Sequence, residues 1–140
     1  MIAEVTRDEI VPVRHAVLRP NLPRQTCLYP EDDRPATFHL AARDADTVVA
    51  CVTFTPEPLD GVPAWRLRGM AVLPGYRNKG LGGRLLVAGV AEVTARGGQL
   101  VWCNGRAAAT TFYQRYGFTV RGEEFDSPPS GPHFRFVRAI

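Results

Sequence analysis

The residue types with the clearest chemical meaning lie in a glycine-rich turn that follows an expected strand. Gly80, Gly82 and Gly83 stand where a helix is expected to begin. The start of a helix leaves backbone N–H groups unpaired and carries a partial positive charge, and glycines let a phosphate approach those groups closely. Arg77 and Lys79 add two cations at this end, which is unfavourable by about 0.3–1 kcal/mol each unless an anion binds there. The turn therefore predicts a phosphate site; the alternative is a glycine-rich junction whose cations face solvent.

Two common phosphate-binding motifs do not match this turn. The chain contains no GxxxxGK[ST] pattern, which excludes a Walker A loop. The run Gly80–Leu85 lacks the last glycine of the dinucleotide motif GxGxxG, and no acidic residue follows about twenty positions later. The predicted phosphate site is therefore of another kind.

The charge distribution indicates a local anion site. The net charge is only +3, but no acidic residue lies between Asp60 and Glu92. That window holds five basic residues, Arg66, Arg68, Arg77, Lys79 and Arg84. A nucleic-acid-binding surface would need a broader basic face interleaved with aromatic residues, so no nucleic-acid partner is expected.

The hydrophobic pattern predicts a mixed α/β fold, with a partly antiparallel sheet, around this turn. Helices are expected over 6–18, where Thr6 and Glu9 have capping-box spacing, and over 80–96 and 106–116. Strands are expected over 38–42, 47–55, 64–72, 99–103, 118–120 and 134–140, the first two forming a hairpin across 44–46. Phe38 and Leu40 alternate with His39, so the first strand is expected to be half-buried with His39 facing outward. The acidic run 31–33 is interpreted as a solvated loop that could also attract a cationic amine.

The length and composition predict one domain over residues 1–140. The chain is 45% hydrophobic and 22% charged, as in an average globular domain, and its 140 residues are enough for one core. Three scattered cysteines without metal-ligand spacing predict a reducing compartment and no metal site. The N-terminus has no apolar signal region, and no run approaches the ~18 apolar residues of a membrane span. A soluble, cytoplasmic protein without a membrane partner is expected.

Two segments of the chain resemble motifs of the GNAT family of N-acetyltransferases. Arg77-x-x-Gly80-x-Gly82, after a strand that ends in Val72-x-Pro74, resembles the acyl-CoA-binding motif of that family. The segment 104–118 is similar to its Asn…Ala…Phe-Tyr-x-x-x-Gly-Phe segment. The resemblance is strong over about 64–122, the expected CoA-binding core. It implies an acyl-CoA N-acyltransferase fold, with a single mixed, V-shaped β-sheet flanked by helices.

The ligand that the resemblance implies is acetyl-CoA, bound as a co-substrate. Its pyrophosphate would lie on the N–H groups of Arg77, Asn78, Lys79, Gly80, Leu81, Gly82 and Gly83. Its pantetheine arm would run along the backbone of Met70, Ala71 and Val72, where two strands splay apart. Asn104 would hold the arm through its side-chain amide; the alternative for Asn104 is a turn residue beside Gly105.

The resemblance assigns the general acid to Tyr113, whose phenol would protonate the departing thiolate. From spacing alone Tyr113 would be a core tyrosine. Many family members carry a glutamate base on the strand equivalent to 64–72, but here that strand carries Arg66 and Arg68. The candidates for the base are His39, His133, Asp32 and Asp33, besides a water chain or an amine that is already neutral. Cys103 is expected to be a buried, inert thiol and Tyr116 a packing residue.

The resemblance therefore implies an enzyme, an N-acetyltransferase that transfers acetyl directly from acetyl-CoA to a primary amine. The missing strand carboxylate leaves one alternative, a non-catalytic acyl-CoA-binding or regulatory module of the same fold. A basic nucleic-acid-binding domain is the less favoured third class. The sequence does not identify the amine, and since family members often dimerise, a homodimer is compatible with the resemblance.

Overall fold

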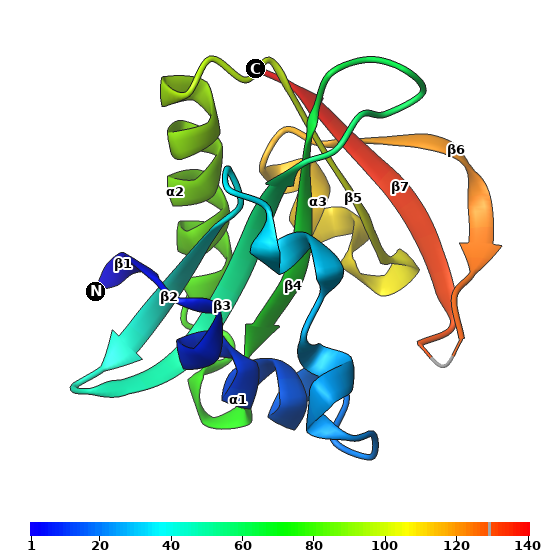
Figure 1. Ribbon diagram of the computed structural model, residues 1–140. Helices are drawn as coiled ribbons and strands as arrows, with labels where there is room; N and C mark the ends of the chain where they lie inside the picture. Colours follow the sequence, from blue (N-terminus) through cyan, green and yellow to red (C-terminus); the bar gives the residue numbers. More distant parts are fainter. Residues whose placement is uncertain (129) are drawn as a thin grey trace.

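A single mixed β-sheet forms the framework of the protein in the computed structural model, which describes residues 1–128 and 130–140 (Figure 1). The described residues form seven strands, β1 (Ile2–Val5), β2 (Phe38–Asp44), β3 (Thr47–Pro56), β4 (Trp65–Val72), β5 (Leu100–Arg106), β6 (Thr119–Asp126) and β7 (Pro132–Ala139). They also form three α-helices, α1 (Arg7–Leu18), α2 (Leu81–Ala95) and α3 (Thr110–Arg115). Short 3₁₀ helices span Arg24–Cys27, Pro30–Asp33, Pro74–Tyr76 and Ala107–Ala109.

The sheet has the strand order β1-β2-β3-β4-β5-β7-β6, and β4 and β5 form its parallel pair. These two strands pair only at Trp65 with Val101 and at Arg66 with Trp102. Beyond Arg66 they diverge, as Figure 1 shows toward its lower half. The predicted mixed, V-shaped sheet flanked by helices is therefore confirmed, and so is the hairpin of β2 and β3.

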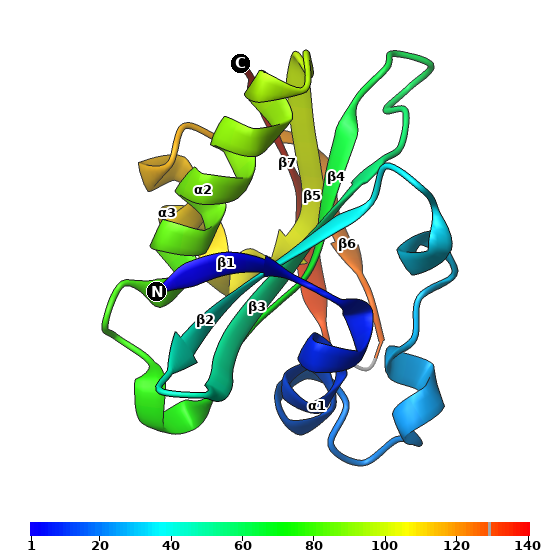
Figure 2. The same cartoon turned by 60° about the vertical axis from the view of Figure 1, so that its left-hand side comes forward.

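The helices cover the two faces of the sheet. Figure 2 shows α1 on one face and α2 with α3 on the other. The larger core lies under α2 and α3, and a smaller cluster of buried residues lies under α1, formed by Ile10, Val13, Ala41, Cys51 and Ala71. The strand predicted over 38–42 is β2, and the prediction that it is half-buried is wrong. Helices cover both faces of β2, and His39 is only 6% exposed.

Local signals set the ends of the two longer helices as predicted. The Thr6 N–H donates to Glu9 Oε1 at 3.0 Å, so the capping interaction forms at the start of α1. α2 begins after Gly80, whose φ of +79° lies in the left-handed region that glycine adopts without strain. It ends before Gly97, whose φ is +85° and whose N–H bonds the Thr94 carbonyl.

The helix predicted over 106–116 is shorter in the structure. β5 continues to Arg106, because it pairs with β7 along its whole length, including Arg106 with His133. The 3₁₀ turn Ala107–Ala109 then precedes α3, which starts only at Thr110. Pairing with the distant strand β7 thus makes Arg106 part of a strand, although the local sequence pattern favoured a helix there. None of the helices in the described residues has the length and apolar character that crossing a bilayer requires.

Candidate functional site

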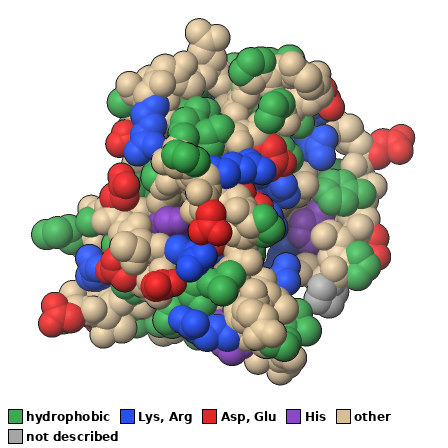
Figure 3. Space-filling view, in the orientation of Figure 1, with side chains coloured by type: hydrophobic (Ala, Val, Ile, Leu, Met, Phe, Trp, Pro, Cys, Tyr) green, Lys and Arg blue, Asp and Glu red, His purple; other side chains and the backbone are tan. Residues whose placement is uncertain are grey.

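A cavity of about 550 Å³ lies where β4 and β5 diverge. Its walls come from β4, from β5, from the C-terminal end of α1, from α3 and from Ser127 and Ser130, which lie between β6 and β7. Figure 3 shows a hollow on this face of the molecule with basic side chains gathered around it. The pairing of β4 with β5 stops at Arg66, so the edge of 67–72 that faces β5 has backbone groups that a ligand can bind.

Gly69 shapes the cavity wall on β4. The pairing between β3 and β4 shifts register here, and Gly69 has a φ of +63°. A Cβ at this position would also lie 3.2 Å from Arg14 Nε and 3.2 Å from Tyr29 Cε2. The backbone conformation and the close approach of these two side chains therefore both require glycine. The bulge sets the direction in which Met70 to Val72 continue along the cavity.

The structure brings part of the predicted cofactor site together. Five of the predicted contacts line the cavity: Met70, Ala71, Val72, Arg77 and Asn104. Arg77 Nε donates to the Val72 carbonyl at 3.1 Å, which folds this guanidinium back toward the end of β4. The other six, Asn78, Lys79, Gly80, Leu81, Gly82 and Gly83, form the adjacent turn and helix start and are not among the cavity-lining residues of the described structure.

Gly82 and Gly83 have different surroundings within that turn. A Cβ on Gly82 would be in ordinary contact with Phe112 and Met70, two residues that line the cavity. A Cβ on Gly83 would lie only 1.9 Å from the Tyr116 hydroxyl, so Tyr116 packs against the start of α2. Tyr116 is therefore a packing residue, as predicted, and Gly82 is the glycine next to the cavity.

Asn104 lies inside β5, opposite Arg135 of β7, so the alternative of a turn at this position is wrong. Its Oδ1 accepts a hydrogen bond from Arg135 Nε at 3.3 Å. This contact holds the amide oxygen and leaves the amide nitrogen as the group that can donate toward the cavity. The neighbouring Gly105 is needed for packing, because a Cβ there would lie 2.7 Å from the Tyr113 ring.

Tyr113 lies in α3 and contributes to the cavity lining while 7% of its surface is exposed. Its ring stacks on Phe136 with the centroids 4.6 Å apart. Burial raises the pKa of Tyr113 well above its usual range, and the neighbouring Cys103 acts in the same direction. The phenol therefore stays protonated at neutral pH. Burial also raises the pKa of Cys103 to about 12, which agrees with the inert thiol that was expected.

Of the four candidate bases, only His133 lines the cavity. Its Nδ1 lies 2.8 Å from the Gly131 carbonyl oxygen. Because a carbonyl oxygen only accepts, the neutral ring carries its proton on Nδ1 and leaves Nε2 free to accept one. His39 does not face outward as predicted: it is buried, bonds Thr53 Oγ1 through Nδ1 at 2.8 Å, and burial lowers its pKa.

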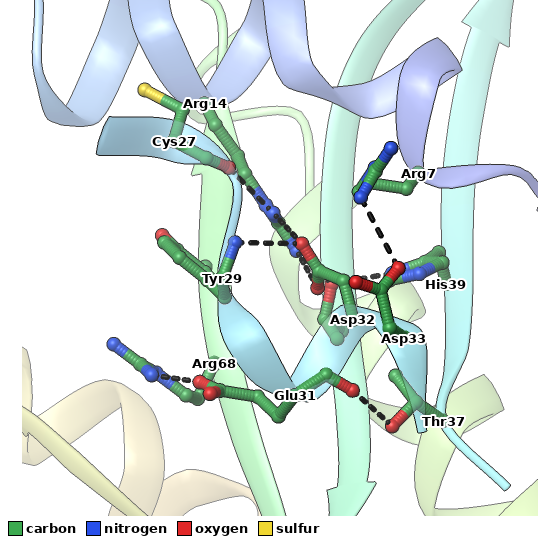
Figure 4. A network of polar contacts seen from close by, with 12 residues as sticks. Arg7, Arg14, Cys27, Tyr29, Glu31, Asp32, Asp33, Thr37, His39 and Arg68 are labelled. Carbon is green, nitrogen blue, oxygen red and sulfur yellow. Dashed lines mark hydrogen bonds and ion pairs between the residues drawn. The ribbon is translucent and has the colours of Figure 1, made fainter. Parts of the chain in front are cut away.

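A buried ion pair holds the loop after α1 against the sheet (Figure 4). The side chains of Arg14 and Asp32 are both 0% exposed, and two hydrogen bonds of 2.8 and 3.0 Å join them. Arg14 also donates to the Cys27 carbonyl at 2.8 Å and to Thr53 Oγ1 at 2.7 Å. Asp32 accepts the Tyr29 N–H at 2.9 Å. This network fixes Tyr29, whose side chain lines the cavity.

The acidic run is therefore not the solvated loop that the sequence predicted. Asp32 is buried with Arg14, and Glu31 is 6% exposed and forms an ion pair with Arg68. Only Asp33 is solvated, with an exposed side chain 3.2 Å from Arg7. The interpretation fails because the partners of Glu31 and Asp32 lie 37 and 18 residues away in the chain.

Sequence reasoning missed the wall of the cavity formed by Val17, Leu18, Arg19 and Tyr29. One signal was available in α1. Arg14 lies four positions after Ile10 and one after Val13, on the apolar face of the helix. A basic residue among buried positions requires a buried acidic partner, and the nearby acidic run offered one.

The chain is similar in sequence to known acetyltransferases. The model of the acetyltransferase (GNAT) domain matches residues 34–120. The Bacillus subtilis (strain 168) protein named uncharacterised N-acetyltransferase YitI is 33% identical over 142 residues, covering 99% of this chain and 95% of that protein.

Two solved structures have the same fold at low sequence identity. Escherichia coli ElaA is 18% identical with a TM-score of 0.82, covering 99% of this chain and 98% of its own. An aminoglycoside 6'-N-acetyltransferase complexed with coenzyme A is 16% identical with a TM-score of 0.79, covering 99% of this chain and 96% of its own.

Proposed function

This chain belongs to the GNAT family of acetyltransferases and is an acetyl-CoA-dependent acyltransferase, and from this premise we propose that it acetylates a primary amine by direct transfer. In this proposal residues 1–140 form one catalytic domain, with the CoA-binding core over about 64–122. The observation that carries the proposal is the cavity at the divergence of β4 and β5, because the family motifs border it from both sides. The aminoglycoside acetyltransferase of the same fold was solved with coenzyme A, which supports a CoA ligand here.

The residues around the cavity fit this ligand. The edge of Met70–Val72 is not paired with β5 and offers backbone groups to an amide-containing arm, apart from the Val72 carbonyl that accepts from Arg77, and Asn104 offers an amide from the facing strand. The start of α2 and Arg77 supply N–H groups and positive charge for phosphates. When bound, acetyl-CoA supplies the thioester whose acetyl group is transferred. In this proposal residues 77–83 contact its pyrophosphate.

Two side chains carry the proton transfers in this proposal. His133 Nε2 accepts a proton from the amine, directly or through a water, as the new C–N bond forms. The Tyr113 hydroxyl donates a proton to the sulfur as the C–S bond breaks. Its position in the cavity wall supports this role, and the phenol has a proton to donate because it is protonated at neutral pH.

Acetyl-CoA is expected to raise the midpoint of thermal unfolding of the purified protein, whereas ATP and NAD are not. Ligand at a hundred times its Kd adds about 2.7 kcal/mol of stability. Gly82→Trp places a large side chain beside Met70 and Phe112 and should abolish the shift, whereas Gly75→Ala, at a glycine with open space around it, should retain it. No shift with the unmodified protein at millimolar acetyl-CoA would refute the cofactor assignment.

His133→Ala is expected to lower kcat by about 10²-fold, the lower end of the range for general acid–base catalysis, because water can partly replace the ring. The KM for acetyl-CoA should change little. Added imidazole should restore part of the lost rate, which a merely structural histidine would not allow. His15→Ala, at a half-buried histidine of α1 outside the cavity lining, is the control. Full activity of His133→Ala would exclude this residue as the base.

A further inference from the structure

One face of the sheet collects basic side chains at the cavity. Alternation along the strands places Arg66 and Arg68 of β4 on the same face as Trp102 of β5 and Arg135 of β7. The contacts agree with this placement. The guanidinium carbons of Arg66 and Arg135 lie 4.8 and 5.0 Å from the Trp102 ring centroid. Arg68 lies 4.4 Å from the centroid of the Tyr29 ring.

The charge of the cavity wall has one sign. Five arginines line it, Arg19, Arg66, Arg68, Arg77 and Arg106, and none of its lining residues in the described structure is acidic. Glu57 pairs with Arg66 at 3.1 Å and Glu31 pairs with Arg68, so these two carboxylates hold guanidinium groups from behind the lining. The described ion pairs include no partner for Arg19, Arg77 or Arg106.

Bound acetyl-CoA would use only part of this charge. In the proposed pose its phosphates lie toward Arg77 and the start of α2, and its pantetheine arm along β4 is uncharged. Arg19 and Arg68 line the same cavity as Tyr29, whose ring centroid lies 4.4 Å from the Arg68 guanidinium carbon. In that pose neither Arg19 nor Arg68 is assigned to a phosphate, so both are left for the acceptor.

Two neighbouring side chains hold Arg68 in position. Figure 4 shows Tyr29 between Arg14 and Arg68, with Glu31 beside Arg68. The Arg68 side chain is still 27% exposed, and its guanidinium has five N–H donors, more than the ion pair with Glu31 uses. Arg19 caps the C-terminal end of α1 and adds a second guanidinium. Paired guanidinium groups are well suited to bind carboxylate or phosphate oxygens.

We propose that the acceptor is a small primary amine that also carries an anionic group, a carboxylate or a phosphate, which Arg19 and Arg68 bind. This inference rests on the proposed function. The anionic group anchors the acceptor beside Tyr29 and directs its amine toward the divergence of β4 and β5. A polyamine would instead bring several positive charges against arginines that already share the cavity.

The same charge assists the reaction. Nearby positive charges disfavour the ammonium form of a bound amine and so favour the neutral form, which is the form that attacks the thioester. β4 carries arginines at 66 and 68 and no carboxylate. The basic wall therefore selects the acceptor and lowers the fraction of bound amine that a base must deprotonate.

Matched pairs of amines that differ in one charge test the inference. Release of the CoA thiol is followed with the twenty amino acids and their amides, with phosphoethanolamine and ethanolamine, and with spermidine. For at least one pair, the anionic member is expected to have a kcat/KM at least tenfold higher than its uncharged partner. A higher rate with the carboxylates or with the phosphate identifies which anion the site prefers. Equal or faster rates with the amides, ethanolamine or spermidine would overturn the inference and leave the proposed function intact.

Arg19→Gln locates the anionic subsite. It should lower kcat/KM for the preferred anionic amine by about tenfold or more and lower kcat/KM for the uncharged partner by a smaller factor, so that the preference for the anionic amine falls. Arg24→Gln, an exposed arginine of the same loop outside the cavity lining, should leave both rates unchanged. Thermal unfolding with acetyl-CoA distinguishes failure of the acceptor inference from failure of the proposed function. A normal shift with no turnover of any amine in the panel counts against the acceptor class, whereas a missing shift counts against the proposed function itself.

Discussion

Tyr113→Phe is expected to lower kcat by about 10²–10⁴-fold, with little change in the affinity for acetyl-CoA. The substitution removes the hydroxyl that we propose protonates the departing thiolate. It retains the ring that stacks on Phe136 at 4.6 Å and packs against Phe118 at 5.7 Å, so the fold and the cavity wall should persist. Steady-state thiol release at saturating amine measures the change.

Tyr116→Phe is the matched control for that measurement. Tyr116 lies in the same region of the chain, but its hydroxyl packs against Gly83 outside the cavity lining. Its variant should keep kcat within a small factor of the unmodified protein. If Tyr113→Phe turns over as fast as Tyr116→Phe, Tyr113 is a core residue and the acid must be sought elsewhere in the cavity.

Arg14→Leu is expected to reduce the free energy of unfolding by about 3–5 kcal/mol, because it leaves the Asp32 carboxylate buried without its partner. Such a loss is a large fraction of the stability of a typical domain. Arg7→Leu breaks the exposed pair with Asp33 and should cost at most about 1 kcal/mol. Urea unfolding midpoints compare the two variants.

The effect of pH on the stability of Arg14→Leu distinguishes an unpaired buried Asp32 carboxylate from a simple loss of packing. Burial alone raises the pKa of Asp32, but the hydrogen bonds from Arg14 and the Tyr29 N–H, with the charge of Arg14, hold it below its usual value. The unmodified protein therefore loses this stabilisation as the pH falls through the lowered pKa. In Arg14→Leu the pKa of Asp32 should rise instead, so this variant should regain stability as the pH falls.

A double variant keeps the test informative if Arg14→Leu does not fold. Arg14→Leu with Asp32→Asn removes both charges and should recover much of the lost stability. The loss in free energy of unfolding could instead be the same at all pH values and unchanged in the double variant. That result would mean that the ion pair is not what holds the loop after α1. Tyr29 would then need another explanation for its fixed position in the cavity wall.

Several features of the fold were predictable because their causes are local. The capping interaction of Thr6 and Glu9 spans three residues, and Gly80 and Gly97 bound α2 through their own backbone conformations. The alternation of strands and helices after Ala64 follows from short-range periodicity. The spacing of Arg77, Gly80 and Gly82 led to the correct family for the same reason, since a binding turn is one continuous segment.

Other predictions failed where distant partners decide the outcome. The alternation of Phe38, His39 and Leu40 shows two faces of a strand, but it cannot show that helices cover both. The acidic run has the pattern of a solvated loop, but its partners are distant in the chain. Arg14 binds Asp32, 18 residues away, and Arg68 binds Glu31, 37 residues away. The end of β5 at Arg106 depends on β7 in the same way.

The sequence by itself determined the family, the strand–turn–helix that precedes and begins α2, and the protonatable residues from which a mechanism can be chosen. Only the tertiary structure decided that His133 lines the cavity while His39, Asp32 and Asp33 do not. Only the tertiary structure, too, brought Arg19 and Arg68 into the wall of one cavity. The physical reason is that hydrogen-bond geometry and chain periodicity act over a few residues, whereas burial and charge depend on every segment that folds against a side chain.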